Sequence, residues 1–551
     1  MRESPLVRNG KTLLSGIDPV RRAERIADAV PVGDRTLYIC PSPLYGYGLA
    51  RLLARLEAEA PNSAILCIEA DSELYELSAG NIDPSLIADK KLRITNICGS
   101  PQLCALVREA WGSRAFRRLE IIRLSGGWQL FPELYDSLVE ALRREIATDW
   151  SNTLTLAKLG RLYIRNALRN LSLVPQFPSI ANLSFGSSPV LVLGAGPSLD
   201  ETLDALCRRF SQTLIPESRP FRIVCVDTSL GALKDRNIIP DLVVILESQH
   251  WNLRDFIGCR GWNIPAAVDL SAQPESAEML GEGFLFVTPW TPLRIFERLK
   301  GADLLPAVIP PLGSVGLSAV EIVRRISPGK IICAGLDFSF SSDKYHARST
   351  PGHRSKLNTQ TRLRSIINAA IYDAASFAAV SKSGCSVRSN PAMRNYRNLF
   401  EQEFSGDPRL FDIAGCGLPL GIKTLSMEDA LSLLGEDLKE ISRTGGAARR
   451  KEEEGELLKE KVLTFFHGEK ERLKDLRGIL TGEAGRERLN VLIDECDYLW
   501  AHFPDCSGGR RPSLTEIVSG SQESLSFLKR VRAEIDPMLK LIEQVTQEGM
   551  P

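Results

Sequence analysis

The chain has 551 residues and a mass of 60.8 kDa. Single hydrophobic cores stop growing near about 250 to 300 residues, so we expect two or three domains. Hydrophobic residues make up 44% and charged residues 25%, close to globular averages, which excludes a disordered or collagen-like chain. Lys plus Arg and Asp plus Glu number 68 each. No overall basic field exists to attract a phosphate backbone, so nucleic acid is not an expected partner.

The start of the chain has no unbroken apolar segment before a small-residue cleavage site. No later run reaches the roughly 20 apolar residues that a membrane span needs. We therefore expect a cytoplasmic protein without a membrane span. The 12 cysteines are scattered without a C-x-x-C motif, and several, such as Cys40, Cys225 and Cys333, lie in apolar strand-like runs. This pattern favours free, buried thiols over disulfides or a zinc site.

The first predicted domain, residues 1–130, has an α/β pattern. Four apolar runs without polar alternation, at residues 36–40, 64–70, 92–97 and 119–124, are typical of strands buried on both faces. Helical patterns separate these runs, as in LARLLARLEAEA after the first. The alternation predicts a parallel sheet with a Rossmann-like topology.

The turn PLYGYG follows the first of these strands, and Glu69 ends the second. This offset resembles that of the acidic residue that binds ribose in Rossmann units. Only Gly46 and Gly48 are present, and no third glycine follows at the fingerprint spacing. A nucleotide site and a tight structural turn both remain open interpretations.

The rest of the chain divides into a helical bridge, a second α/β domain and a helical tail. Apolar residues at three- and four-residue spacings predict the bridge at 131–180. Seven strand-like runs predict a central α/β domain at 181–430, and the β signals stop after about Met427. Residues 431–551 carry interspersed charges around apolar helical stripes, which predicts a C-terminal helical bundle.

The motif GAGPSL, residues 194–199, lies between the strand-like run VLVL and an amphipathic helical pattern. Gly194 and Gly196 allow a tight turn and close approach to a ligand, while Ser198 offers an amide and a hydroxyl to an anion. A phosphate suits this position. The alternative is a plain strand-to-helix turn, which Asp200 and Glu201 favour because they already complement the helix macrodipole.

Three further strand or helix ends carry polar residues. Asp227 and Glu247 each close a predicted strand, so both carboxylates are expected at the carboxyl edge of one sheet, where they could bind ribose hydroxyls or a base edge. Capping of the following segment is the alternative for both. Gly313 and Ser314 open a helical run and offer amides to a diphosphate or a substrate carboxylate.

Acid and base candidates gather after the last strand-like run. Asp337 ends that run, and His346 and His353 follow in a chain with five histidines. This is a modest enrichment of groups able to move a proton near neutral pH. Surface histidines without a role are the alternative. A metal held by His346 and His353 is not expected, because the loop between them fixes no coordination geometry.

Four motifs together carry a family resemblance. GAGPSL, VDTSLGALKDRNIIPDLVVILES, PPLGSVGLSAVEIV and GLDFSFSSDKYHA, in this order and spacing, resemble the bacterial motility accessory factor family. The central domain of that family is shared with 6-hydroxymethylpterin diphosphokinase-like proteins. The segment LLSGIDPVRRAERIAD and the PLYGYG turn resemble its N-terminal domain, so the similarity covers residues from about 12 to 430.

This resemblance implies an inverting flagellin glycosyltransferase. Such an enzyme moves a nonulosonic acid of the pseudaminic or legionaminic type from a CMP-activated donor to Ser or Thr hydroxyls of flagellin. The central domain would resemble bacterial sialyltransferases. The resemblance assigns the nucleotide phosphate to Gly194, Gly196 and Ser198, the nucleoside to Asp227 and Glu247, and the anionic half of the donor to Gly313 and Ser314.

For catalysis, the resemblance and the residues together favour His346 as the base, with Asp337 positioning it or the acceptor; the reverse assignment stays open. No metal is expected, and the partners implied are flagellin and a nucleotide-sugar, with an oligomer possible. Two alternatives remain. The first is transfer of a diphosphate from ATP to a pterin alcohol, with Mg²⁺ on Asp227, Glu247 and Asp337. The second is a non-catalytic flagellin-binding assembly factor.

Overall fold

The computed structural model describes residues 6–112, 115–210, 216, 219–259, 261–340, 344–363, 365–366, 375–435, 452–482, 486–504, 506 and 522–547. Contacts divide the chain into two compact units. Unit 1 comprises Met1–Gly160 and Ala501–Ser513, and unit 2 comprises Arg161–Trp500 and Leu514–Pro551. Each unit is described by itself.

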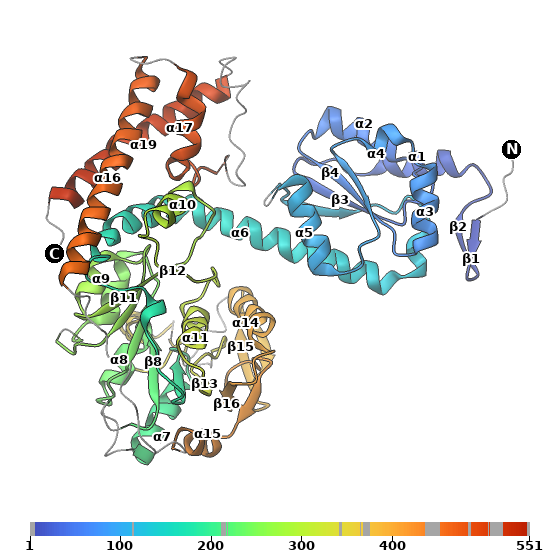
Figure 1. Ribbon diagram of the computed structural model, residues 1–551. Coiled ribbons are helices and arrows are strands. Elements are labelled where there is room, and N and C mark those ends of the chain that lie inside the picture. Colours follow the sequence, from blue (N-terminus) through green and yellow to red (C-terminus); the bar gives the residue numbers. More distant parts are fainter. Residues whose placement is uncertain are drawn as a thin grey trace. The chain divides into compact units, whose positions relative to one another are not determined.

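Unit 1 is built on a four-stranded parallel sheet in the order β5-β4-β3-β6 (Figure 1). Its strands are β3 (Thr36–Pro41), β4 (Ala64–Ile68), β5 (Leu92–Thr95) and β6 (Arg118–Ile121). They match the four predicted runs, and the parallel sheet of the first domain is confirmed. A short hairpin of β1 (Leu6–Arg8) and β2 (Lys11–Leu14) precedes the sheet.

Both faces of this sheet are covered because alternate side chains of each strand enter different cores. Leu37 and Ile39 pack in the core that the helices α5 and α6 cover, whereas Tyr38 and Cys40 pack beneath α1 and α2. The helices are α1 (Pro19–Ala29), α2 (Leu49–Glu59), α3 (Ser72–Asn81), α4 (Pro84–Ile87), α5 (Ser100–Trp111) and α6 (Pro132–Asn170).

The predicted bridge is one helix, α6, of 39 residues. Its residues up to Gly160 belong to unit 1, and those from Arg161 belong to unit 2. Among the helices of the described residues, none combines the length and the apolar character needed to cross a bilayer.

Unit 2 holds a nine-stranded sheet in the order β12-β11-β10-β9-β8-β7-β13-β16-β17, and every pairing in it is parallel. The strands are β7 (Val190–Leu193), β8 (Arg222–Val226), β9 (Leu242–Ile245), β10 (Ala266–Asp269), β11 (Gly283–Val287), β12 (Ala307–Val308), β13 (Ile331–Ala334), β16 (Leu410–Ile413) and β17 (Lys423–Leu425). The first seven coincide with the predicted runs, which confirms the second α/β domain. The last two were not predicted.

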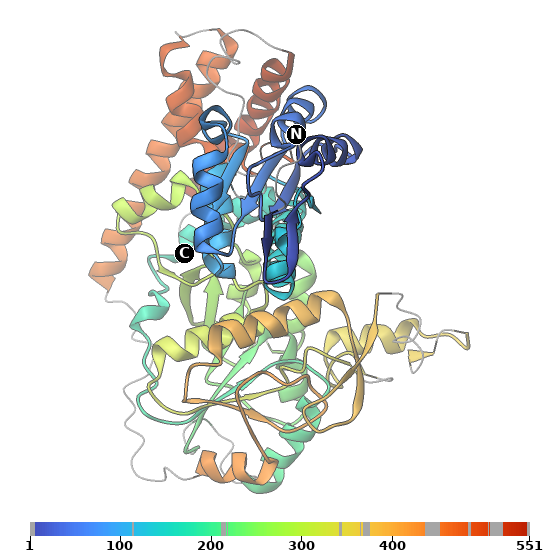
Figure 2. The same cartoon turned by 90° about the vertical axis from the view of Figure 1, so that its right-hand side faces the viewer.

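Helix α11 (Val315–Ile326) packs across the centre of this sheet, where Val320 and Val323 join a core that also contains Val192 and Val224. Helix α14 (Pro391–Phe404) lies beside α11 (Figure 2), and the Arg324 guanidinium stands 5.3 Å from the centre of the Phe404 ring. The other elements here are α7 (Leu199–Phe210), α8 (Leu230–Lys234), α9 (Pro274–Glu278), α10 (Arg294–Gly301), α12 (Pro351–Thr359), α15 (Met427–Gly435) and the hairpin β14 (Phe377–Val380) to β15 (Ser386–Ser389).

The tail contains the helices α16 (Glu452–Thr481), α17 (Leu489–Glu495) and α19 (Gln522–Gln547), which stand side by side in Figure 1. These helices belong to unit 2. One reason is the buried carboxylate of Glu469, which accepts hydrogen bonds from Arg298 on α10 at 2.7 and 3.0 Å. The sequence analysis assigns residues 431–551 to a separate helical domain, and that boundary stays a prediction.

The order of the large sheet reverses between β7 and β13. From β7 to β12 the chain adds strands on one side, and β13 then pairs with the other side of β7. In open α/β sheets the loops at such a reversal leave a crevice outside the carboxyl ends of the strands, where ligands bind. The candidate site is therefore sought at this edge.

Packing explains one glycine of the first turn and generates a prediction. Gly48 has a φ of 84°, and a Cβ there would lie 2.8 Å from the Ala23 carbonyl oxygen. We expect Gly48→Ala to lower the free energy of unfolding by about 2 kcal/mol or more. The positive φ is unfavourable for alanine, and the Ala23 carbonyl leaves no room for its Cβ atom. Gly80→Ala in α3 is the matched control, since a Cβ there meets nothing within 4 Å. Calorimetry of both variants checks this, and equal losses would contradict it.

Candidate functional site

The turn at residues 194–198 lies against the loop that follows β13. Gly194 N–H donates to the Ala334 carbonyl and Gly196 N–H to the Gly335 carbonyl, both at 2.8 Å. A Cβ on Gly196 would stand 2.5 Å from the Asp337 Oδ2 atom. The two loops approach so closely that only glycine fits between them.

Asp337 occupies the position at the start of α7 where the sequence analysis predicts a phosphate. Its Oδ2 accepts the Ser198 amide at 2.7 Å, and its Oδ1 accepts the Ser198 hydroxyl at 2.6 Å. The Asp337 residue is only 1% exposed. A carboxylate at a helix N-terminus is stabilised by the helix dipole, as a phosphate would be. Both donors of Ser198 are therefore engaged within the protein, and the role of residues 194–198 toward a ligand stays a prediction.

A third loop, residues 414–417 after β16, closes over this contact. A Cβ on Gly417 would lie 2.8 Å from the Asp337 Oδ1 atom, and one on Gly415 would lie 3.4 Å from the Ser198 Cβ atom. The Leu418 amide donates to the Asp337 carbonyl at 2.8 Å. The loops of three neighbouring strands thus meet around one carboxylate. The sequence analysis missed the third loop because it missed β16.

His346 lies beside the same turn, since the amide of the next residue, Ala347, donates to the Ala195 carbonyl at 3.0 Å. Within the described chain, the buried His346 Nδ1 atom has no hydrogen-bond partner. Burial, followed by the charges of Lys356 and His353, lowers the pKa of His346. A neutral imidazole can accept a proton. The hydrogen bonds of the Asp337 carboxylate go to Ser198, so the predicted coupling of Asp337 to His346 stays a prediction.

Asp200 fastens the segment that carries His346 to the start of α7. Its Oδ2 accepts from the Lys344 ammonium at 3.1 Å and from the Arg348 amide at 3.0 Å, and its Oδ1 accepts from Arg236 at 3.2 Å. The sequence pointed only to a favourable charge near the helix dipole. His353 is buried in the first turn of α12, 7% exposed.

Asp227 is buried at the end of β8, where it accepts the Thr228 amide at 2.7 Å and the Asn252 side-chain amide at 2.8 Å. Burial outweighs these bonds and raises the pKa of Asp227 to about 6. The Asn252 amide also reaches the Asp255 Oδ2 atom at 3.4 Å. Burial and the charge of Asp227 raise the pKa of Asp255 to about 7. The sequence analysis missed Asn252 and Asp255, which lie in the 3₁₀ helix His250–Phe256 and read as loop residues.

Glu247, after β9, is exposed and accepts the Gln249 amide at 2.9 Å. Its charge contributes to the raised pKa values of Asp227 and Asp255, so the three carboxylates share one region of the edge. In the described part of the chain, no three His, Cys, Asp or Glu residues group closely enough to hold a metal ion. The structure therefore brings the two predicted carboxylates together at this edge.

Gly313 and Ser314 precede the N-terminus of α11. Gly313 has a φ of 70°, and a Cβ there would meet the Tyr396 ring at 3.1 Å. Ser314 is the N-cap residue, and its side chain makes no capping hydrogen bond. Burial raises the pKa of Tyr396. Burial, Glu247, Asp269 and Tyr396 together raise the pKa of Tyr163 to about 12. The sequence analysis missed both tyrosines because they come from α14 and α6, far from the motifs.

In unit 1, Glu69 is 1% exposed and bonded within the protein. It accepts the Ser42 hydroxyl at 2.5 Å, the Asp71 amide at 3.3 Å and the Tyr135 hydroxyl at 3.4 Å. Its oxygens thus brace the loop after β3, whose residue Ser42 has a φ of 51°. This geometry favours the structural interpretation of the first turn over a ribose site.

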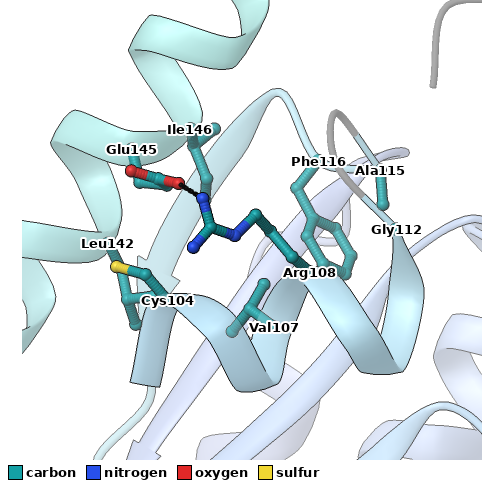
Figure 3. A pocket seen from close by; sticks show the side chains of 9 residues that line it. All are labelled: Cys104, Val107, Arg108, Gly112, Ala115, Phe116, Leu142, Glu145 and Ile146. Carbon is teal, nitrogen blue, oxygen red and sulfur yellow. Dashed lines mark hydrogen bonds and ion pairs between the residues drawn. The ribbon is translucent and has the colours of Figure 1, made fainter. Parts of the chain in front are cut away.

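A pocket in unit 1 lies between α5 and α6 (Figure 3). Arg108 crosses it to pair with Glu145 at 2.9 Å, and Phe116 and Leu142 supply apolar walls. The space between these side chains is enough for about one water molecule.

The Ser198–Asp337 contact yields a stability prediction. We expect Asp337→Ala to lower the free energy of unfolding by about 1 to 3 kcal/mol, because it removes the acceptor of two partly buried donors of Ser198. A double-mutant cycle of Asp337→Asn with Ser198→Ala should give a coupling of about 1 to 3 kcal/mol by denaturant unfolding. Glu201→Gln, at an exposed position on α7, is the control. A coupling indistinguishable from zero would contradict the contact.

The raised pKa of Asp255 predicts a pH dependence. Between the ordinary value of 3.8 and about 7, the folded chain keeps a proton that the unfolded chain loses. The contribution of Asp255 to stability therefore falls as the pH rises through this window. We expect Asp255→Asn to be more stable than the parent at pH 8, by on the order of 2 kcal/mol, and nearly equal at pH 4. Denaturant unfolding at pH 4 and pH 8 tests this, with Glu278→Gln, at an exposed position, as the control. The same difference in free energy of unfolding between Asp255→Asn and the parent at both pH values would contradict the prediction.

Comparisons with known proteins bear on the whole arrangement. A protein-family model described as "6-hydroxymethylpterin diphosphokinase MptE-like" matches residues 163–343. An uncharacterized protein of Treponema pallidum (strain Nichols) is 29% identical over 543 residues, which cover 95% of this chain and 90% of that protein.

Among solved structures, the MAf glycosyltransferase from Magnetospirillum magneticum AMB-1 aligns with a TM-score of 0.54 at 14% sequence identity. The alignment covers 99% of this chain and 84% of that one. At this identity the likeness concerns the fold. Residues 163–343 thus resemble the MptE-like family, and the fold of the chain is similar to that of a MAf glycosyltransferase.

Proposed function

We propose that this chain is an inverting glycosyltransferase that moves a nonulosonic acid from a CMP-activated donor to Ser or Thr hydroxyls of flagellin in the cytoplasm. One observation carries the proposal. The start of α11, the acidic strand ends and His346, whose pKa burial lowers, all belong to the loops at one edge of the nine-stranded sheet, around the reversal between β7 and β13.

The donor phosphate is assigned to the start of α11. Asp337 fills the start of α7, whereas Ser314 makes no capping bond at the start of α11. The two helix starts are close, because a Cβ on Gly194 and one on Gly316 would each lie 2.6 Å from the same Leu336 methyl group. The first amides of a helix carry partial positive charge and suit a phosphate or a carboxylate.

The nucleoside is assigned to Asp227 and Glu247. Glu247 is exposed and offers its carboxylate directly, whereas Asp227 is buried and already accepts from Thr228 and Asn252. Carboxylates accept hydrogen bonds from ribose hydroxyls and from the exocyclic amine of cytosine. Tyr163 and Tyr396 are within electrostatic reach of each other, and the field of Glu247 reaches Tyr163. An aromatic ring near Glu247 would offer the base a stacking partner.

The reaction follows from these assignments. The acceptor oxygen bonds to the anomeric carbon from the face opposite to CMP, and the bond from that carbon to the phosphate oxygen breaks with its electron pair on CMP. His346 takes the hydroxyl proton, and the amides of α11 stabilise the charge that develops on the leaving phosphate. Opposite-face attack inverts the configuration of the sugar.

Diphosphate transfer to a pterin is the second candidate, because the matching family model carries that description. Such a reaction uses Mg²⁺ held by carboxylates. Here Asp337 is engaged by Ser198, and Asp227 is engaged by Asn252 and Thr228. These bonds within the protein leave Asp337 less available to a metal ion, which favours the glycosyltransferase.

A binding experiment tests the donor site. We expect calorimetry to detect CMP binding and Gly313→Ala to weaken it about tenfold, because a Cβ at φ 70° displaces Tyr396 and the start of α11. Gly482→Ala is the matched control: its φ is 84°, and a Cβ there meets nothing within 4 Å. Equal affinities for CMP in the parent and in Gly313→Ala would contradict the assignment.

A turnover experiment separates the three candidate functions. The proposal expects a CMP-nonulosonic acid donor to increase the mass of purified flagellin by whole sugar units, with loss of the increase in His346→Ala. ATP-dependent and Mg²⁺-dependent formation of a pterin diphosphate would support the kinase instead. Flagellin binding without any mass increase would support the assembly factor.

A further inference from the structure

Two cysteines lie at the loop that covers the Ser198–Asp337 contact. Cys385 is the exposed cysteine of the 12, and Cys416 is half-buried in the 414–417 loop. Eight of the others are buried, and the remaining two, Cys98 and Cys207, are half-buried elsewhere. Neither Cys385 nor Cys416 has a part in the proposed transfer reaction.

Hydrogen bonds fasten the loops of the two cysteines to each other. The Ser383 hydroxyl donates to the Gly415 carbonyl at 2.7 Å, and the Lys382 amide donates to the Gly417 carbonyl at 2.8 Å. These two acceptors flank Cys416. The turn between β14 and β15 is tight, because the Ser381 amide donates to the Cys385 carbonyl at 2.9 Å. Cys385 thus closes the same hairpin turn whose residues Lys382 and Ser383 bond to the 414–417 loop.

A buried ion pair holds this turn in place. The Lys382 ammonium donates to the Asp412 carboxylate of β16 at 2.6 Å, and both side chains are at most 3% exposed. The two thiols also lie within electrostatic reach. Burial is the main cause of the raised pKa of Cys416, and Cys385 contributes to it.

We propose that Cys385 and Cys416 form a reversible disulfide that controls the loop over the Ser198–Asp337 contact. The oxidant class is a peroxide. The exposed Cys385 thiolate attacks a peroxide oxygen and becomes a sulfenic acid, releasing water or an alcohol. The Cys416 sulfur then attacks the sulfenic sulfur, the S–S bond forms, and a second water leaves. The two thiols lose two electrons and two protons in total, and a dithiol restores them.

The disulfide would act on the candidate site through glycine contacts. A disulfide needs its Cα atoms about 5.5 to 6 Å apart, so its formation fixes the 414–417 loop against the hairpin turn. That loop places Gly417 against Asp337 and Gly415 against Ser198. Fixing or shifting the 414–417 loop would therefore change the mobility of the turn at residues 194–198. The effect on donor binding rests on the proposed function, whereas the bond itself does not.

The first experiment looks for the bond in the full chain. Reduced protein is treated with hydrogen peroxide, alkylated and digested. We expect two alkylatable thiols to be lost, a cross-linked peptide joining Cys385 to Cys416, and full recovery with dithiothreitol. Cys385→Ser and Cys416→Ser should each abolish the cross-link, whereas Cys207→Ser should retain it. A cross-link to any other cysteine, or oxidation of Cys385 without a cross-link, would overturn the proposal.

The second experiment measures the consequence. Hydrogen exchange at residues 415–418 should slow on oxidation of the parent and stay unchanged on oxidation of Cys416→Ser. Equal exchange in the oxidised and reduced parent would overturn the proposal that the disulfide controls the loop. CMP affinity should differ about tenfold between the oxidised and reduced forms, a coupling within the usual range. If neither form binds CMP, the proposed function fails, and the exchange result alone decides on the switch. If the disulfide forms and the oxidised and reduced proteins bind CMP equally well, the disulfide does not control donor binding.

Discussion

The hydrogen bonds between Asp337 and Ser198 are the contact on which the arrangement of the site depends. They join the loop after β13 to the start of α7 across the place where the order of the sheet reverses. A carboxylate buried at 1% exposure is tolerated there because an amide, a hydroxyl and the helix dipole all stabilise its charge. The glycines on both sides leave room for it. The carboxylate of Asp337 therefore determines how the loops at the crevice of this sheet pack together.

Burial of carboxylates extends along the same edge. The pKa values of Asp227, Asp255 and Asp412 are raised to about 6, about 7 and about 6, with burial as the main cause in each case. Even the buried Lys382 does not offset this cost for Asp412. Groups held in an unfavourable charged state cluster at functional sites more often than elsewhere. The carboxyl edge thus holds three of the carboxylates whose pKa burial raises.

Local pattern predicted the strands that alternate with helices, because such strands are apolar throughout and bounded by turn residues. β16 and β17 were not predicted, because the sequence of β16, LFDI, contains a charged residue and that of β17, KTL, has only three residues. The motif residues could be predicted because they lie at the ends of strands and helices, where glycine and polar residues mark the turns in the sequence. Asn252, Asp255, Tyr163 and Tyr396 were missed, since nothing local marks a side chain whose neighbour lies far along the chain. The filling of the predicted phosphate position by Asp337 depends on a contact across 139 residues, which no spacing rule reveals.

The ion pair of Arg298 with Glu469 limits where this polypeptide can be divided. The family-model match ends at residue 343, yet the guanidinium on α10, inside that match, finds its counter-charge on α16. A gene fragment ending before α16 would remove both acceptors of Arg298, the Glu469 carboxylate and the Glu495 carbonyl, and would expose the surface that the tail covers. The α/β region and the tail are therefore expected to be inherited, expressed and degraded as one piece.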